Sequence, residues 1–112
     1  MLKLTNKTTR TENYDDEVHT FTAYDVDGTV TLAGDGLWGA EEGRVVRVNK
    51  ISVVEMQYED GDSSTMVNVE HDTTWDIYTD SAFEAAVSTA LGLDVTFTEQ
   101  GMQDDNYASM EI

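Results

Sequence analysis

The sequence predicts an α+β fold: an antiparallel β-sheet of about five to seven strands, with a long central hairpin and one α-helix packed on one face. Several β-rich runs are separated by turn signals along the first 78 residues. One later segment, residues 81–91, has apolar residues at helical spacing. The alternating strand–helix pattern of a parallel sheet is missing. The chain, residues 1–112, is the size of a single small domain.

The N-terminal third is predicted to contain one short hairpin. Residues 1–17 are rich in Thr and Asn and are read as either a short strand or a flexible arm. Residues 19–26 and 29–33 favour strands, and they flank Asp27-Gly28. Because this dipeptide tolerates positive φ at both centres of a type I′ turn, the sequence predicts a hairpin here.

Residues 25–29, Asp-Val-Asp-Gly-Thr, are similar to the nucleophile motif of haloacid-dehalogenase-like phosphatases. In that family one aspartate attacks phosphorus, the next is the acid and base, and Mg²⁺ bridges them. The family also has a parallel sheet, a downstream lysine and a distal acidic pair. This chain lacks the parallel pattern, so we interpret the motif as a hairpin turn.

The central hairpin and the helix have clearer signals. Residues 44–58 form one β-rich run, an acidic turn follows at 59–63, and residues 65–78 return. Ser81 and Glu84 match a capping box at the start of a helix. Its apolar stripe consists of Phe83, Ala86, Val87, Ala90 and Leu91, and Gly92 is placed to end it. Short strands are expected around residues 93–97 and 107–112.

Charge is the most informative feature for function. The chain carries 23 Asp and Glu against six Lys and Arg, a formal net charge of −17. No Lys or Arg follows Lys50, whereas fourteen carboxylates do. A surface of this sign repels nucleic acid and anionic lipid, and it attracts basic proteins or cations. We therefore expect no direct nucleic-acid partner and no membrane association.

Specific chemistry is not indicated. The chain has no Cys, and its two histidines, His19 and His71, are 52 residues apart without a ligand motif. Glycine-rich phosphate loops and nucleophile elbows are missing as well. We expect a non-enzymatic protein without a cofactor, a metal site or catalytic residues. The N-terminus lacks the apolar run of a signal peptide, so a cytoplasmic location is expected.

The candidate binding surface is the central hairpin. Glu70, Asp72, Asp76 and Asp80 fall on even positions, so a strand would place them on one face. Glu55 and Glu59 would add a second acidic row. The predicted contact residues are Glu55, Glu59, Asp60, Asp62, Glu70, Asp72, Asp76 and Asp80, with Tyr58, Trp75 and Tyr78 as aromatic anchors.

The leading hypothesis is an acidic inhibitor that imitates nucleic acid and blocks the basic channel of a DNA- or RNA-handling enzyme. In charge and size the chain resembles uracil-glycosylase inhibitors, antirestriction decoys and several anti-CRISPR proteins, which implies a viral protein acting in a host cytoplasm. Spread evenly, its acids would lie about 16 Å apart, beyond the ~8 Å Debye length. The hypothesis therefore requires clustered carboxylates.

Besides a metal-dependent enzyme, which would have to turn over phosphate esters, two alternatives stay open. One is a small structural or assembly protein, such as a virion component, which would form a homo-oligomer. The other is a domain from a high-salt organism, whose acidity reflects habitat and would be spread evenly.

Overall fold

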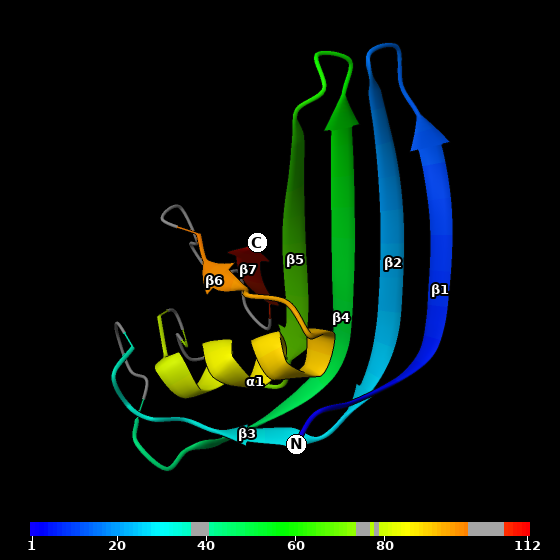
Figure 1. Cartoon of the computed structure of the whole chain (residues 1–112). Coiled ribbons are helices and arrows are strands. Elements are labelled where there is room, and N and C mark those ends of the chain that lie inside the picture. Colours follow the sequence, from blue (N-terminus) through cyan, green and yellow to red (C-terminus); the bar gives the residue numbers. More distant parts are fainter. Residues whose placement is uncertain (37–40, 74–76, 78, 99–106) are drawn as a thin grey trace.

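The computed structural model describes residues 1–36, 41–73, 77, 79–98 and 107–112, and it confirms the predicted fold class. These residues form a seven-stranded antiparallel sheet and one helix (Figure 1). The elements are β1 Lys3–Asn13, β2 Glu17–Asp27, β3 Thr29–Thr31, β4 Val45–Tyr58, β5 Ser63–His71, α1 Ser81–Leu91, β6 Thr96–Phe97 and β7 Tyr107–Glu111. The strand order is β1-β2-β4-β5-β7-β6, and β3 pairs with the start of β4.

The N-terminal segment is a strand, which decides between the two readings of residues 1–17. β1 runs antiparallel to β2 along the edge of the sheet. Its register with β2 shifts between Thr5 and Thr8, and Asn6 within this bulge has a φ of 53°. The Asn6 side-chain amide donates to Asp25 Oδ2 at 3.0 Å, which stabilises the bulge.

The hairpin predicted at Asp27-Gly28 is wrong. β2 and β3 do not pair with each other; both pair with β4, β2 along residues 50–58 and β3 along residues 45–47. Gly28 has a φ of 148°, and a Cβ at this position would lie 2.5 Å from the Met1 carbonyl oxygen. Gly28 therefore allows the chain to bend between β2 and β3 and allows the N-terminus to approach closely, instead of forming the predicted hairpin turn.

In the first part of β4 the even-numbered residues are buried, and in the second part the odd-numbered residues are buried, so both parts of the strand contribute to the core. Val46 and Val48 are buried in its first part, and Ile51 and Val53 in its second. The register with β5 shifts between Val48 and Lys50, so an extra residue is inserted there. This bulge keeps both pairs on the same face of the sheet.

α1 packs on that face. Phe83 and Val87 are fully buried, and the Phe83 ring meets the His71 ring edge to face at 6.0 Å. The cap lies one residue before the predicted Ser81: the Asp80 carboxylate accepts from the N–H groups of Ala82 and Phe83. Gly92, with a φ of 68°, ends the helix as predicted.

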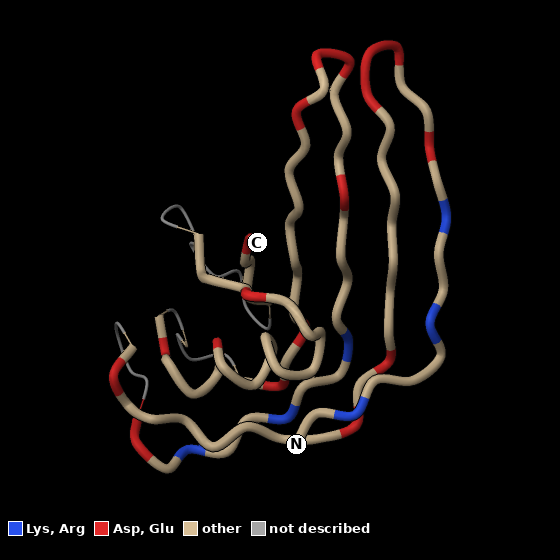
Figure 2. Tube along the Cα trace, in the orientation of Figure 1, with Lys and Arg blue, Asp and Glu red and all other residues tan. Residues whose placement is uncertain are grey.

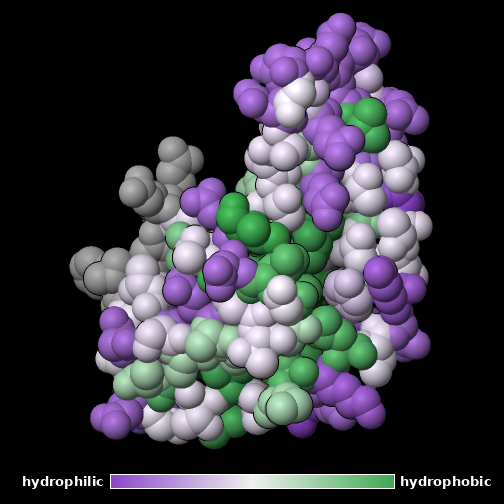
Figure 3. Space-filling model, in the orientation of Figure 1, coloured by the Kyte–Doolittle hydropathy of each residue, from purple (hydrophilic) through white to green (hydrophobic). Residues whose placement is uncertain are grey.

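The sheet has a helix face, on which α1 packs, and an opposite open face. The helix face carries the buried residues Val53 and Val67, which pair across β4 and β5. The open face carries Val54 and Met66, which pair on the opposite side. β1, β2, β4 and β5 extend well past α1, which lies beside the lower ends of β5 and β4 (Figure 1). Figure 3 shows hydrophilic residues over the projecting ends and hydrophobic residues near the helix.

The acidic row predicted along residues 70–80 does not form. β5 ends at His71, so Asp72 belongs to the following connection. There its Oδ1 accepts the Arg47 N–H at 3.0 Å. Asp80 is the buried helix cap, and Asp76 lies outside the described residues. The even spacing of Glu70, Asp72 and Asp80 in sequence thus reflects a strand end and a helix start, not one strand face.

Candidate functional site

The main charged feature of the structure is a pair of acidic hairpin turns. The β1–β2 turn is closed by the Tyr14 N–H, which donates to the Glu17 carbonyl at 2.8 Å. The β4–β5 turn is closed by the Tyr58 N–H, which donates to the Asp62 carbonyl at 2.9 Å. Gly61, with a φ of 91°, provides the left-handed conformation that this second turn requires.

Pairing of β2 with β4 brings the two turns together. Glu17 at the start of β2 lies opposite Tyr58 at the end of β4. Beyond this pair, the Glu59 N–H donates to the Asp16 carbonyl at 3.0 Å, so one turn is bonded directly to the other. We call the resulting group the acidic tip; it comprises Glu12, Asp15, Asp16, Glu17, Glu59, Asp60 and Asp62.

The tip has almost no compensating charge. Figure 2 shows acidic residues at both turns and the basic residues farther down the strands. Arg10 is the basic residue nearest along β1; it pairs with Glu12 and its guanidinium lies 4.4 Å from the centre of the Phe21 ring. Four neighbouring strands span about 15 Å, at ~4.8 Å per gap. The tip carboxylates therefore lie within roughly a Debye length of their neighbours, and their fields add.

Five of the predicted contact residues lie at or near the tip. Glu59, Asp60 and Asp62 belong to it, and Tyr58 precedes it as a half-buried residue at the end of β4. The Tyr58 hydroxyl lies 3.4 Å from Ser64 Oγ. Glu55 is exposed on the helix face of β4, three residues before the strand ends.

The other predicted residues lie elsewhere. Glu70 is at the opposite end of β5, across from Lys50, and its Oε1 accepts from the Tyr107 hydroxyl at 3.1 Å. Asp72 accepts a backbone N–H in its connection. Asp80 is fully buried, so its assignment as a contact residue is wrong. Trp75, Asp76 and Tyr78 lie outside the described residues.

Sequence reasoning missed the first half of the tip. The segment that the sequence indicated as either a short strand or a flexible arm ends in Glu12, Asp15, Asp16 and Glu17, so these acids were not joined to the second turn. The available signal was the similarity of two acidic runs, each placed between β-rich segments. When two hairpins lie side by side and their adjacent strands run antiparallel, as β2 and β4 do, both turns lie at the same end of the sheet.

Hydrogen bonds order the side chains around the first turn. The Tyr14 hydroxyl donates to Glu12 Oε2 at 2.7 Å, and this bond to a carboxylate raises the pKa of Tyr14. Glu17 Oε2 lies 2.7 Å from His19 Nε2, and the His19 and Tyr14 rings are 4.5 Å apart. Tyr14 and His19 thus hold the Glu12 and Glu17 carboxylates on this side of the tip.

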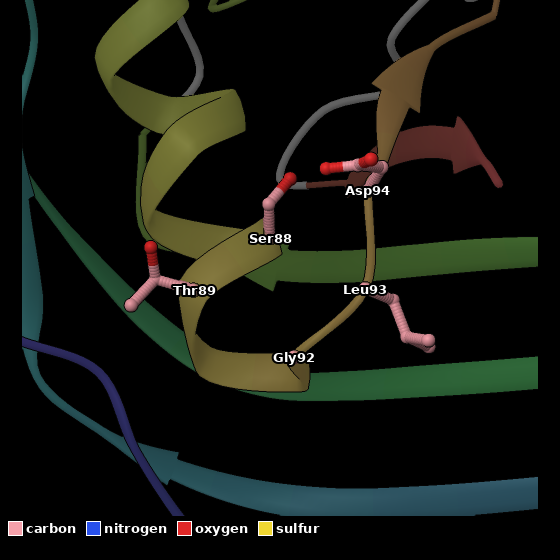
Figure 4. Close-up of a pocket in the computed structure, with 5 residues that line it drawn as sticks. All are labelled: Ser88, Thr89, Gly92, Leu93 and Asp94. Atoms are coloured by element: carbon pink, nitrogen blue, oxygen red, sulfur yellow. The ribbon is translucent and has the colours of Figure 1, made fainter.

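A shallow pocket of about 290 Å³ at the end of α1 is lined by Ser88, Thr89, Gly92, Leu93 and Asp94 (Figure 4). The Ser88 hydroxyl donates to the Val95 carbonyl and accepts the Val95 N–H, so it serves the helix end. Within the described ranges, no three His, Asp or Glu residues gather as metal ligands.

The chain matches no protein-family model, no curated protein and no solved structure. In the described part of the chain, no helix is both long and apolar enough to cross a membrane.

Proposed function

We propose that this protein is a non-enzymatic inhibitor that presents its acidic tip to the basic, nucleic-acid-binding surface of a DNA- or RNA-handling enzyme. The observation that carries the proposal is the bonding of two acidic turns into one tip through Glu59 and Asp16. A cluster of this kind is what imitation of a phosphate backbone requires, and evenly spread acids would not provide it.

The mechanism follows from the charge arrangement. Long-range attraction steers the tip toward a basic channel and speeds association, with strong dependence on salt. Once bound, the projecting end of the sheet excludes the nucleic acid by occupying its site. No bond is made or broken, so inhibition is competitive with nucleic acid and stoichiometric.

The rigid backbone of the tip supports this role. The β1–β2 and β4–β5 hairpins are paired along nine residues of β2 and β4. Carboxylates carried on paired strands keep their spacing, whereas those on a disordered tail must be ordered when they bind. A preorganised tip therefore loses less conformational entropy when it binds, and more of the interaction free energy contributes to affinity.

The gathering of seven acids at one end also favours this function over adaptation to high salt, which predicts even dispersion. A second candidate, assembly into a homo-oligomer, is favoured by one observation. β1 is an eleven-residue edge strand whose residues are mostly exposed, and a free edge can pair with another strand. Its bulge and its Lys7 and Arg10 side chains oppose such pairing.

An affinity experiment with matched variants tests the proposal. The tip variant is Glu59→Gln/Asp60→Asn/Asp62→Asn. The control variant, Glu41→Gln/Asp27→Asn/Asp94→Asn, removes the same charge at exposed positions away from the tip. Each full-length protein is immobilised, exposed to nuclease-treated lysate at low salt and eluted with a salt step.

We expect wild type and the control variant to retain the same nucleic-acid enzyme in stoichiometric amount, and the tip variant to lose it. Added duplex or single-stranded nucleic acid should displace that enzyme. Equal retention by the tip variant, or retention of unrelated basic proteins alone, would refute the proposal. A symmetric oligomer in light scattering, without a retained enzyme, would support assembly instead.

A further inference from the structure

The open face beside the acidic tip carries an unusual apolar surface. Phe21 on β2 lies opposite Val54 on β4, and Val54 lies opposite Met66 on β5, so one apolar row crosses three strands. In the next row toward the tip, His19 lies opposite Met56. We call Phe21, Val54, Met56 and Met66, with His19 and Tyr14 at the tip end, the apolar belt.

The belt gives the open face an apolar surface that a sheet covered on one side does not usually have there. The covered face is expected to be apolar and the open face polar. At the level of the belt, β1 and β2 carry threonine pairs on the helix face, Thr9 opposite Thr22 and Thr11 opposite Thr20, whereas β4 and β5 carry the buried Val53 and Val67 there. Because α1 packs on the helix face, no described helix covers the belt.

The belt is local to the tip end of the open face. One row farther from the tip, Ala23, Ser52 and Asn68 lie side by side. The row after that holds Asp25, Lys50 and Glu70. The far end of the open face is therefore polar, as a solvated face should be, and only the part that adjoins the carboxylates is apolar.

Exposure shows that the belt is accessible. Met66 is 42% exposed and Tyr14 is 50% exposed, and Val54 and Met56 are half-buried. Phe21 is also half-buried, with the Arg10 guanidinium 4.4 Å from the centre of its ring. Methionine and aromatic side chains are enriched where proteins bind proteins, because they supply large and adaptable contact area. Exposed apolar area next to a polar rim is typical of such a site.

The charges around the belt select its occupant. A second copy stacked in parallel would bring tip against tip. Stacked antiparallel, it would bring the tip toward Asp25, Lys50 and Glu70, a row with two acids and one base. Both arrangements oppose like charges, so a second copy is disfavoured and a partner with basic residues beside an apolar surface is favoured.

We infer that the apolar belt and the acidic tip form one continuous docking surface for a protein whose apolar patch is bordered by Lys and Arg. The inference rests on the proposed function and adds to it that the open face, not the helix face, meets the partner. The tip provides attraction and the belt provides selectivity, since desolvated apolar anchors distinguish one basic protein from another.

Two synthetic helical peptides serve as probes of this chemistry. They carry equal numbers of lysines; one has a leucine stripe beside the lysines and the other has serines in its place. The belt variant is Val54→Thr/Met66→Thr. The control, Val18→Thr, makes the valine-to-threonine change of the belt variant on a half-buried residue of the helix face. The tip variant is the triple variant described above.

Binding is measured by fluorescence anisotropy at low and moderate salt. We expect the full-length wild type to bind the leucine peptide about ten-fold more tightly than the serine peptide. Val18→Thr should keep this preference. The belt variant should bind both peptides with the affinity that wild type has for the serine peptide. The tip variant should bind both peptides more weakly than wild type does.

The outcomes separate the two proposals. The docking surface is refuted if wild type shows no preference for the leucine peptide, or if the belt variant keeps that preference. If the tip variant still binds both peptides more weakly than wild type, the proposed function stands. If neither peptide binds, or if the tip variant binds as wild type does, the proposed function fails and the docking surface with it. A wild-type dimer in sedimentation that the belt variant abolishes would assign the belt to a second copy and overturn the inference.

Discussion

The backbone N–H of Glu59 donates to the carbonyl oxygen of Asp16 at 3.0 Å, joining two turns that are 43 residues apart. This bond continues the β2–β4 ladder one step beyond its last strand pair, Glu17 with Tyr58. Like-charged turns would separate if their backbones were independent, because their carboxylates repel. The bond holds the two turns at ladder spacing despite that repulsion.

The first prediction concerns exchange of the Glu59 amide. Although Glu59 is exposed in a turn, its N–H is bonded, so we expect hydrogen exchange at least ~10-fold slower than the intrinsic rate for its sequence. Two-dimensional NMR in D₂O at neutral pH measures this rate. Exchange at the intrinsic rate would show that the two turns open independently.

The second prediction concerns the cost of the clustered charge. Glu59→Gln/Asp62→Asn should raise Tm by about 2–4 °C at low salt, because it removes repulsion within the tip. In 1 M salt the gain should vanish, since the Debye length falls to ~3 Å. Thermal unfolding followed by circular dichroism gives both values.

A control pair at positions away from the tip, Asp27→Asn/Asp94→Asn, should change Tm by a smaller amount at low salt. Equal gains for the two pairs would mean that the charge acts as a uniform field over the surface. That result would favour the high-salt explanation of the acidity over a dedicated tip.

Local sequence signals predicted single helices and strands better than they predicted which strands pair. The helix was predicted as residues 81–91 and is observed as Ser81–Leu91, since its apolar stripe and Gly92 act within a few residues. β4 was predicted in the same way from a long β-rich run. Asp27-Gly28 failed because a turn dipeptide fixes local conformation, while pairing of both flanking strands with β4 is decided by tertiary packing.

The candidate site was half predictable for the same reason. The second acidic turn, with Asp60 and Asp62, was read correctly because it lies between two clear β-rich runs. Alternation of acids along residues 70–80 was misleading, since Asp80 is the helix cap. Joining the first turn to the second required the pairing of β2 with β4, which depends on residues far apart in sequence.

The third prediction concerns Asp80 as a structural residue. Its carboxylate accepts from Ala82 and Phe83 at the start of α1 and from Ala33 and Gly34 in the connection between β3 and β4. Asp80→Ala would remove the acceptor that the buried Asp80 carboxylate provides for these four N–H groups, of which the Phe83 N–H is itself buried. We expect a loss of at least about 3 kcal/mol in the free energy of unfolding, measured by urea denaturation.

Asp35 provides a comparison for this loss. Its carboxylate accepts the N–H and hydroxyl of Ser81 next to the same helix start, and these bonds lower the pKa of Asp35. Because Asp35 is exposed, Asp35→Ala should cost less than Asp80→Ala. A loss for Asp80→Ala no larger than that for Asp35→Ala would contradict the role assigned to burial.

The fourth prediction concerns the pH dependence of stability. His71 is 1% exposed, and burial lowers its pKa from the ordinary value of 6.5, although the neighbouring Asp72 opposes this shift. Between pH 6.5 and the lower folded-state pKa, the unfolded chain binds a proton that the folded chain does not. The free energy of unfolding therefore falls as the pH falls below 6.5, by up to ~1.4 kcal/mol per pH unit from this residue.

Urea denaturation between pH 7.5 and 5.5 at constant ionic strength measures this slope. His71→Leu should lower the slope, whatever it does to absolute stability, because it removes the titrating group. His19→Gln serves as the control for the second histidine, which lies on the open face beside Glu17. If His71→Leu kept the full wild-type slope, the pH dependence would arise outside the core, and the buried imidazole would not be its cause.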